Sequence, residues 1–328
     1  MAESILVTGG AGFIGSHLAE KLLAAGNRVA ILDNFSDFYD PALKRKNAES
    51  VARAGGEIVE GDFRDSSAMI KLMNHLQPHT VVHLGACAGV IPSVKDPVLY
   101  AETNVLGTTI LLDAATRVDT EKFILASSSS VYGNNRKVPF AEADPVTEPI
   151  SPYAASKRSC ELIAHAFSHL HHLAISALRF FTVFGPRQRP DLAINLFMRK
   201  IAAGEPITMF GDGSMSRDYT YIDDIISGTM AAISDCGKKK LFRIYNLGGN
   251  SPVRLDDLIR EIERVVGREA IIIKEPERPG DVKQTYADLA RSREELGFAP
   301  QTPLKEGLQK QWLWMQQSGM VESSSVQK

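Results

Sequence analysis

The chain has 328 residues, which corresponds to about two domains of typical size or one large domain. Hydrophobic residues make up 44% and charged residues 23%, a composition typical of a globular protein with a sizeable core. The formal net charge is -2, so we expect neither a nucleic-acid partner nor an anionic membrane surface. No apolar run reaches the ~18 residues of a membrane-spanning helix, and we expect no signal peptide and no membrane partner.

The three cysteines, Cys87, Cys160 and Cys236, are widely spaced. Their spacing matches neither a metal site nor a disulfide framework, so we expect no metal. Free thiols are typical of a reducing compartment, and we therefore expect the protein to be cytoplasmic.

Short apolar segments alternate with amphipathic segments through the first 180 or so residues. The predicted strands are 5–8, 28–33, 58–61, 81–84, 122–127 and 174–179, and the predicted helices are 13–25, 67–76, 101–117 and 153–171. This alternation predicts an α/β fold, a Rossmann-type doubly wound parallel sheet with helices on both faces. Continuous apolar runs are typical of strands that are buried on both sides.

The alternation stops after residue 181. Residues 182–190 are predicted to form a loop, followed by a helix at 193–203, a strand at 207–210 and helices at 223–233 and 254–266. We expect a first domain of residues 1–181, to which a segment at about 217–250 returns. The remainder, mainly within 182–328, is expected to form a smaller interleaved lobe.

A glycine-rich segment, Gly10-Ala11-Gly12-Phe13-Ile14-Gly15, follows the first predicted strand and opens the first predicted helix. In this context the glycines allow a tight turn and a close approach of a pyrophosphate to the helix N-terminus. Asp33 ends the next predicted strand, where a carboxylate can accept both hydroxyls of an adenosine ribose and would repel a 2′-phosphate. The pattern predicts NAD binding, with NAD preferred over NADP.

Hydroxyl groups follow the fifth predicted strand, in the segment Ser127-Ser128-Ser129-Ser130. Ligands of open α/β sheets bind at the carboxyl ends of the strands. Tyr153 and Lys157 are four residues apart and share one face of a predicted helix. A nearby ammonium group favours the ionised form of a phenol, which makes the pair suitable for proton transfer. Each pattern alone also fits a polar strand end or a surface pair.

Together, the glycine segment, the Ser–Tyr–Lys set and Ser127-Ser128-Ser129-Ser130-Val131-Tyr132-Gly133 resemble the extended short-chain dehydrogenase/reductase family. Within that family they resemble the nucleotide-sugar epimerases. The resemblance implies that Ser128, Tyr153 and Lys157 are catalytic. It also implies a homodimer formed through the helices at 101–117 and 153–171.

The resemblance further implies two sets of binding residues. The cofactor set, for NAD, is Gly9, Gly12, Phe13, Ile14, Asp33, Asn34, Asp62, Phe63, Leu84, Ala86, Asn104, Ser127, Tyr153, Lys157 and Phe180. The substrate set, for a UDP-sugar, is Ser128, Thr182, Arg189, Asn195, Arg217, Arg278 and Asp281. Arg217 and Arg278 match diphosphate-binding arginines, and guanidinium groups pair with phosphates in a bidentate manner.

Two pairs of positions distinguish members of the family. Ser129 and Ser130 stand where dehydratases and decarboxylases carry acidic residues, which excludes the first chemistry and disfavours the second. Thr182 and Arg189 resemble the UDP-glucuronate 4-epimerases, in which the arginine would pair with the sugar carboxylate. The chain departs from that subgroup at Arg187-Gln188 and Ile91-Pro92, which leaves the identity of the sugar open.

We therefore expect an isomerase that inverts C4 of a UDP-sugar, with UDP-glucuronate and UDP-galacturonate as the first expectation. UDP-glucose and UDP-galactose, or their N-acetyl forms, are the alternative substrates. A nucleotide-sugar decarboxylase or reductase and a non-catalytic NAD-sensing protein are the remaining alternatives.

Overall fold

The computed structural model describes residues 2–277 and 282–321. Its centre is a seven-stranded sheet in the order β10-β6-β5-β4-β1-β2-β3, in which every neighbouring pair is parallel. The strands are β1 (Ser4–Thr8), β2 (Arg28–Asp33), β3 (Glu57–Glu60), β4 (Thr80–His83), β5 (Lys122–Ser128), β6 (Ala174–Phe180) and β10 (Phe242–Leu247). The predicted doubly wound α/β fold is confirmed.

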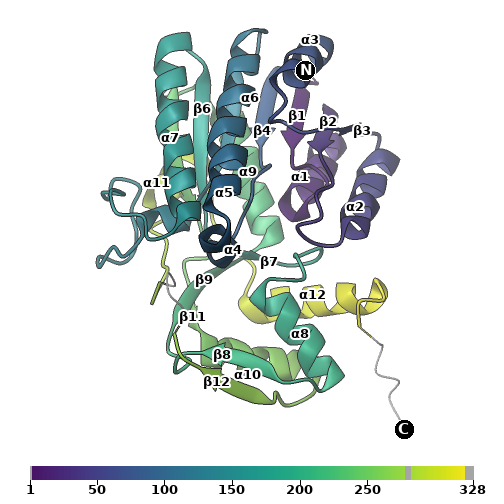
Figure 1. Ribbon diagram of the computed structural model, residues 1–328, viewed down its shortest axis with the longest axis vertical. Helices are drawn as coiled ribbons and strands as arrows, with labels where there is room; N and C mark the ends of the chain where they lie inside the picture. The colour runs from purple at the N-terminus through teal and green to yellow at the C-terminus, as the bar shows by residue number, and fades with distance from the viewer. Residues whose placement is uncertain (1, 278–281, 322–328) are drawn as a thin grey trace.

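Helices cover both faces of this sheet (Figure 1). One face carries α3 (Ser66–Leu76), α6 (Gly107–Thr116) and α7 (Pro152–His171); the other carries α1 (Phe13–Ala24), α2 (Pro41–Arg53), α9 (Ile222–Asp235) and α11 (Ala290–Leu296). Side chains alternate between these faces along each strand, as the period of two requires. In β1, for example, Ile5 and Val7 pack under α1, whereas Leu6 packs under α3 and α6.

The segment that leads into α6 has three short helical pieces. They are α4 (Val90–Lys95), α5 (Pro97–Tyr100) and the π-helix η1 (Ala101–Leu106), which continues directly into α6. The single helix predicted at 101–117 is therefore π-helical in its first six residues. π-turns within helices are frequently found at functional sites.

A smaller lobe lies below the carboxyl edge of the sheet (Figure 1). It contains the three-stranded sheet β11-β9-β7 and the two-stranded sheet β12-β8. Its elements are β7 (Thr182–Phe184), β8 (Ile207–Phe210), β9 (Ser216–Tyr221), β11 (Pro252–Arg254), β12 (Ile272–Glu275), α8 (Ala193–Ala203), α10 (Leu255–Val266) and α12 (Leu304–Gln317). A single apolar core runs from α1 and α9 into α8, α10 and α12.

One sequence prediction in this lobe is wrong. Residues Thr182–Phe184 form strand β7 rather than part of a loop, because β9 pairs with them in parallel register. The partner strand lies more than 30 residues further along the chain, so no local pattern reports it. Conversely, β10, α9 and α11 come from the second half of the chain and pack on the first-half sheet.

All three cysteines are free thiols, as expected. Within residues 2–277 and 282–321, no helix combines the length and apolar character needed to cross a membrane.

Candidate active site

The glycine-rich turn lies at the N-terminus of α1, as the sequence predicts. Gly9 has φ +66°, a conformation that favours glycine, and a Cβ atom on Gly15 would lie 2.2 Å from the Gly9 carbonyl oxygen. Gly12 caps α1 without a side-chain hydrogen bond, and the first turn contains no acidic residue. The first N–H groups of α1 therefore form a site that suits a pyrophosphate.

Asp33 ends β2 beside this turn and is 8% exposed. Its carboxylate accepts hydrogen bonds from the backbone N–H of Phe35 (2.9 Å) and of Ala11 (3.2 Å). Lys44 Nζ lies 3.8 Å from Asp33 Oδ1. Burial raises the pKa of Asp33, and the Lys44 ammonium opposes that shift. The carboxylate is thus held in a fixed orientation and keeps lone pairs that ribose hydroxyls could use.

Three further residues of the predicted cofactor set, Asn34, Asp62 and Phe63, follow the ends of β2 and β3. Asn34 Nδ2 donates to Asp62 Oδ2 (3.1 Å), and Arg64 pairs with the same carboxylate at 2.7 Å. Hydrogen bonding from Arg64 lowers the pKa of Asp62 to about 2, although partial burial acts in the opposite direction. The Phe63 ring is buried against the edge of His83.

Leu84 and Ala86 follow β4, next to the glycine turn, and Leu84 N–H donates to the Thr8 carbonyl (3.2 Å). Asn104, in the π-helical turn, holds this segment in place. Its Oδ1 accepts from Cys87 N–H (2.8 Å) and its Nδ2 donates to the Cys87 carbonyl (2.9 Å). The Asn104 amide therefore supports the shape of the predicted cofactor loop.

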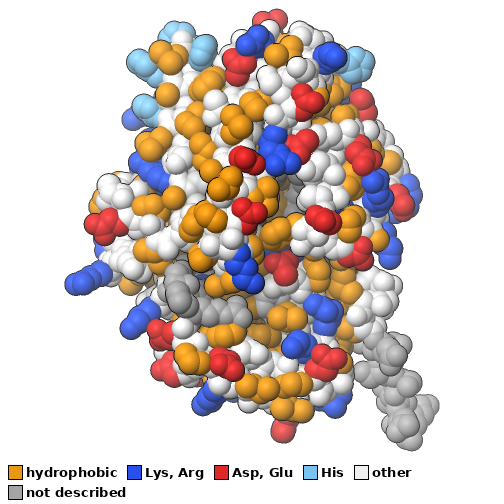
Figure 2. Space-filling model, in the orientation of Figure 1, with side chains coloured by type: hydrophobic (Ala, Val, Ile, Leu, Met, Phe, Trp, Pro, Cys, Tyr) orange, Lys and Arg blue, Asp and Glu red, His pale blue; other side chains and the backbone are white. Residues whose placement is uncertain are grey.

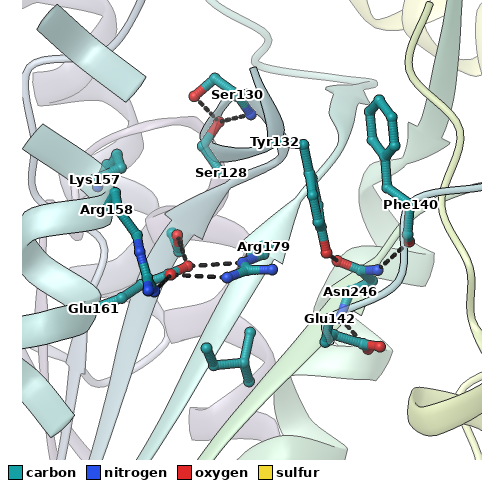
Figure 3. A network of polar contacts seen from close by, with 12 residues as sticks. Ser128, Ser130, Tyr132, Phe140, Glu142, Lys157, Arg158, Glu161, Arg179 and Asn246 are labelled. Carbon is teal, nitrogen blue, oxygen red and sulfur yellow. Dashed lines mark hydrogen bonds and ion pairs between the residues drawn. The ribbon is translucent and has the colours of Figure 1, made fainter. Parts of the chain in front are cut away.

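Two of the three predicted catalytic residues, Ser128 and Lys157, lie at the carboxyl end of β5, and Tyr153 is on the same helix as Lys157. Ser128 Oγ accepts hydrogen bonds from Ser130 N–H (3.2 Å) and Ser130 Oγ (2.9 Å), which leaves its own proton available (Figure 3). Lys157 is buried on α7 and donates from Nζ to the Ala126 carbonyl (2.8 Å). Tyr153, one turn earlier on the same helix, is half-buried and meets Tyr100 edge-on.

A buried polar network lies directly beneath these residues (Figure 3). Glu161 of α7 accepts from Ser127 Oγ at 2.6 Å and pairs with Arg179 of β6 at 2.8 Å. Neither residue was predicted from the sequence to belong to the site. Two signals were present: Glu161 follows Lys157 by one helical turn, and Arg179 is a charged residue within an apolar strand.

On the substrate side, Arg189 packs on an aromatic ring and pairs with a carboxylate. Its guanidinium lies 5.0 Å from the centre of the Phe38 ring and forms a two-pronged ion pair with Asp191, at 3.0 and 2.6 Å. Tyr39 and Tyr153 lie near enough to interact electrostatically with it. Thr182 begins β7, and Arg217 lies on the neighbouring strand β9.

Three predicted substrate residues remain, Asn195, Arg278 and Asp281, and the structure describes the first of them. Asn195 is fully buried, and its side chain bonds the Gln188 carbonyl (2.8 Å) and Arg199 Nε (3.0 Å), so its role toward a substrate stays a prediction. Arg278 and Asp281 lie outside the described residues.

The departure at Arg187-Gln188 has a structural explanation. Arg187 pairs with Glu20 of α1 (2.9 Å), and the Gln188 amide bonds Gln311 of α12 and the Val183 carbonyl. Both side chains thus bind the loop after β7 to its neighbouring helices. These contacts account for the two residues without involving the sugar.

The parallel sheet, the glycine turn at the N-terminus of α1 and the carboxylate at the end of β2 define a dinucleotide-binding protein of the Rossmann class. More particularly, the chain belongs to the GDP-mannose 4,6 dehydratase family, which it matches over residues 6–311.

Several proteins similar to the chain are named UDP-sugar 4-epimerases. It is 42% identical to UDP-glucuronate 4-epimerase 4 of Arabidopsis thaliana, over 95% of this chain and 75% of that protein. The structure of UDP-glucuronic acid 4-epimerase from Bacillus cereus, in complex with UDP-glucuronic acid and NAD, has a TM-score of 0.89 at 36% identity, covering 96% and 99% of the two chains. UDP-glucose 4-epimerase from Thermotoga maritima, with UDP-glucose, has a TM-score of 0.88 at 32% identity and the same coverage.

Proposed function

We propose that this protein is an NAD-dependent isomerase that inverts C4 of a UDP-sugar, with a UDP-hexuronate as its preferred substrate. The observation that carries the proposal is the bond from Lys157, on the α7 face that also carries Tyr153, to the end of the strand that carries Ser128, in a sheet whose first strand leads into a glycine turn suited to a dinucleotide. Relatives that act on UDP-glucuronate and contain NAD support it.

The residues divide the chemistry among them. When bound, NAD serves as the acceptor and then the donor of the C4 hydride. Tyr153 removes the proton of the 4-hydroxyl, Ser128 orients that hydroxyl, and Lys157 supplies a positive charge that favours the phenolate. The resulting 4-keto sugar turns about its diphosphate and receives the hydride on its other face, after which Tyr153 returns the proton.

The preference for a uronate is supported by the position of Arg189. Its guanidinium is mostly buried near Tyr153, and a second anion in this site would be costly to bury without a cationic partner. Thr182 would add a hydrogen-bond donor. The neutral UDP-hexoses remain the second candidate, because Arg189 already has a carboxylate partner in Asp191 and because a UDP-glucose 4-epimerase is similarly related.

A homodimer is part of the proposal. Hydrophobic side chains gather on the face formed by α5, η1, α6 and α7 (Figure 2), among them Val98 (64% exposed), Leu106 (52%) and Leu162 (55%). Apolar side chains spread over adjacent helices are typical of an interface with another chain. Sedimentation of the purified protein would test this. We also propose a cytoplasmic location, in keeping with the three free thiols.

A panel of sugar nucleotides tests the function. Purified protein is incubated with UDP-glucuronate, UDP-galacturonate, UDP-glucose, UDP-galactose and their N-acetyl forms, without added NAD, and the products are separated. We expect interconversion of the two uronates and retention of bound NAD through many turnovers. Stoichiometric oxidation that stops after one turnover would indicate a dehydrogenase instead, and release of carbon dioxide would indicate a decarboxylase.

A further inference from the structure

Glu161 connects three elements of the active site through one carboxylate. It lies on α7, one turn after Lys157 and two turns after Tyr153, so the three residues share a helix face. Its oxygens accept from Ser127 Oγ of β5 (2.6 Å) and from Arg179 Nε and Nη2 of β6 (2.8 and 2.9 Å). Arg158 adds a bond at 2.9 Å (Figure 3).

The bonds from α7 converge on the residues that precede Ser128. Lys157 Nζ bonds the Ala126 carbonyl, and Glu161 bonds the hydroxyl of the next residue, Ser127. Two successive residues of β5 are thus bonded to two successive turns of α7. The position of Ser128 relative to the Tyr153 face of α7 is therefore constrained by two bonds between β5 and α7.

Arg179 continues the network toward the turn after Ser128. Its guanidinium lies 4.7 Å from the centre of the Tyr132 ring, and the Tyr132 hydroxyl donates to Asn246 Oδ1 (2.7 Å). Asn246 Nδ2 in turn bonds the carbonyls of Phe140 (2.8 Å) and Asp288 (3.1 Å). The chain on both sides of Ser128 is thereby anchored to β6 and β10.

The cost of this arrangement argues for a role beyond stability. The Arg179 and Glu161 side chains are 1% and 0% exposed, and a buried ion pair is often no more stabilising than an apolar pair of similar volume. Burial disfavours the charged carboxylate, yet the bonds from Arg179 keep the pKa of Glu161 below its usual value. An ion pair at this position offers fixed, directional bonds, which an apolar pair cannot provide.

We propose that Glu161 and Arg179 are a positioning pair that sets the geometry between Ser128 and the Tyr153–Lys157 face of α7. This inference rests on the proposed catalytic roles of those three residues. Neither Glu161 nor Arg179 is assigned contact with the substrate. A displacement of about 1 Å of a reacting group can reduce a rate about 100-fold, so loss of the pair should act on turnover.

The test uses the holoenzyme with its bound NAD and compares three proteins with the parent. They are Glu161→Gln, the double variant Glu161→Leu/Arg179→Met, and the matched control Glu295→Gln. Glu295 also pairs with an arginine, Arg243 (2.5 Å), and accepts from a hydroxyl, that of Tyr245 (3.0 Å), but it lies on α11 at the far edge of β10. Bound NAD per chain, thermal midpoint, kcat per NAD-loaded chain and KM are measured for each.

We expect Glu161→Gln to lower kcat per NAD-loaded chain about 10- to 100-fold, with KM changed less than threefold. The double variant should recover a thermal midpoint close to that of the parent, because the only charge left without its partner is Arg158, which is 28% exposed, while kcat stays low. Glu295→Gln should lower the thermal midpoint and leave kcat per loaded chain unchanged.

Parental kcat in the double variant, or a loss in Glu161→Gln that is fully explained by fewer NAD-loaded chains, would overturn the proposal. If the double variant does not fold, Glu161→Gln alone decides between these outcomes. A Tyr153→Phe variant that keeps parental turnover would instead refute the catalytic assignment on which the inference rests, so the two failures are distinguishable.

Discussion

Replacing Tyr153 by Phe removes one hydroxyl group from α7 and leaves the helix surface otherwise intact. Because we assign the proton transfer at the 4-hydroxyl to this phenol, turnover should fall by about 100- to 10,000-fold. NAD and UDP should still bind, since nearly all of their proposed contacts are made by other residues. Turnover and bound NAD are measured on the same preparation, and activity within tenfold of the parent would contradict the assignment.

A second single-residue prediction concerns Arg189 and substrate specificity. A charge-assisted hydrogen bond contributes about 1.5–3 kcal/mol, which corresponds to roughly 10- to 150-fold in kcat/KM. Arg189→Ala should therefore lower kcat/KM for a UDP-hexuronate by about that factor and spare its neutral counterpart. The two sugars are compared in parent and variant.

Arg187 provides the control for this experiment. It lies two residues earlier in the same loop, but its guanidinium pairs with Glu20 of α1. Arg187→Ala should change both sugars equally, through the position of the loop. If Arg189→Ala also affects both sugars equally, its role is structural and the preference for a uronate loses its main support.

The packing of α1 on β1 is a property of an element rather than of one side chain. A Cβ atom on Gly15 would lie 2.2 Å from the Gly9 carbonyl oxygen and 2.8 Å from Gly10 Cα. Since both are backbone atoms, Gly15→Ala should displace α1 from the turn. We expect loss of bound NAD, measured after purification, and a lower thermal midpoint.

Gly26, just after α1, provides a control that distinguishes the effect of a steric collision from that of conformational strain. It has φ +84°, and a Cβ atom there would meet no other atom within 4 Å. Gly26→Ala should cost about 1 kcal/mol of stability through strain alone and keep bound NAD. Retention of NAD in both variants would show that close approach at Gly15 is not needed for the site.

For the molecule as a whole, the free energy of unfolding at acid pH depends in part on His83, which is buried in the central sheet. It is fully buried between Thr8 of β1 (2.6 Å) and Thr108 of α6 (3.0 Å). Burial, assisted by the Lys157 charge, lowers the pKa of His83 to about 3. Between pH ~6.5 and ~3 the unfolded chain therefore holds a proton that the folded chain excludes, so this contribution to stability is lost as pH falls.

The slope for one proton is about 1.4 kcal/mol per pH unit at most. His83→Gln, which can still donate to one threonine and accept from the other, should reduce the loss of unfolding free energy between pH 6.5 and 4.5. Urea unfolding at several pH values measures that loss for both proteins. Parallel pH profiles would mean that other groups govern acid unfolding.

Residues of the candidate site could be predicted from the sequence mainly where their partners are close in the chain. The glycine turn, Asp33 and the Tyr153–Lys157 pair could be predicted because each is encoded within one or two neighbouring elements. Glu161 and Arg179 were missed, since a buried charge can be interpreted only when its partner on another element is known. The Asp191 partner of Arg189 was missed for a different reason: two-residue spacing in a loop does not indicate contact.

The amino-acid sequence was sufficient to predict the alternation of strands and helices, the glycine turn and the helix face that Tyr153 and Lys157 share. These depend on local periodicity and on backbone freedom at single residues. The pairing of β7 with β9, the place of β10 beside β6 and the carboxylate that links α7 to two strands are seen only in the folded chain. Those features depend on hydrogen-bond partners that are distant in sequence, and their stability comes from burial that exists only after the chain has folded.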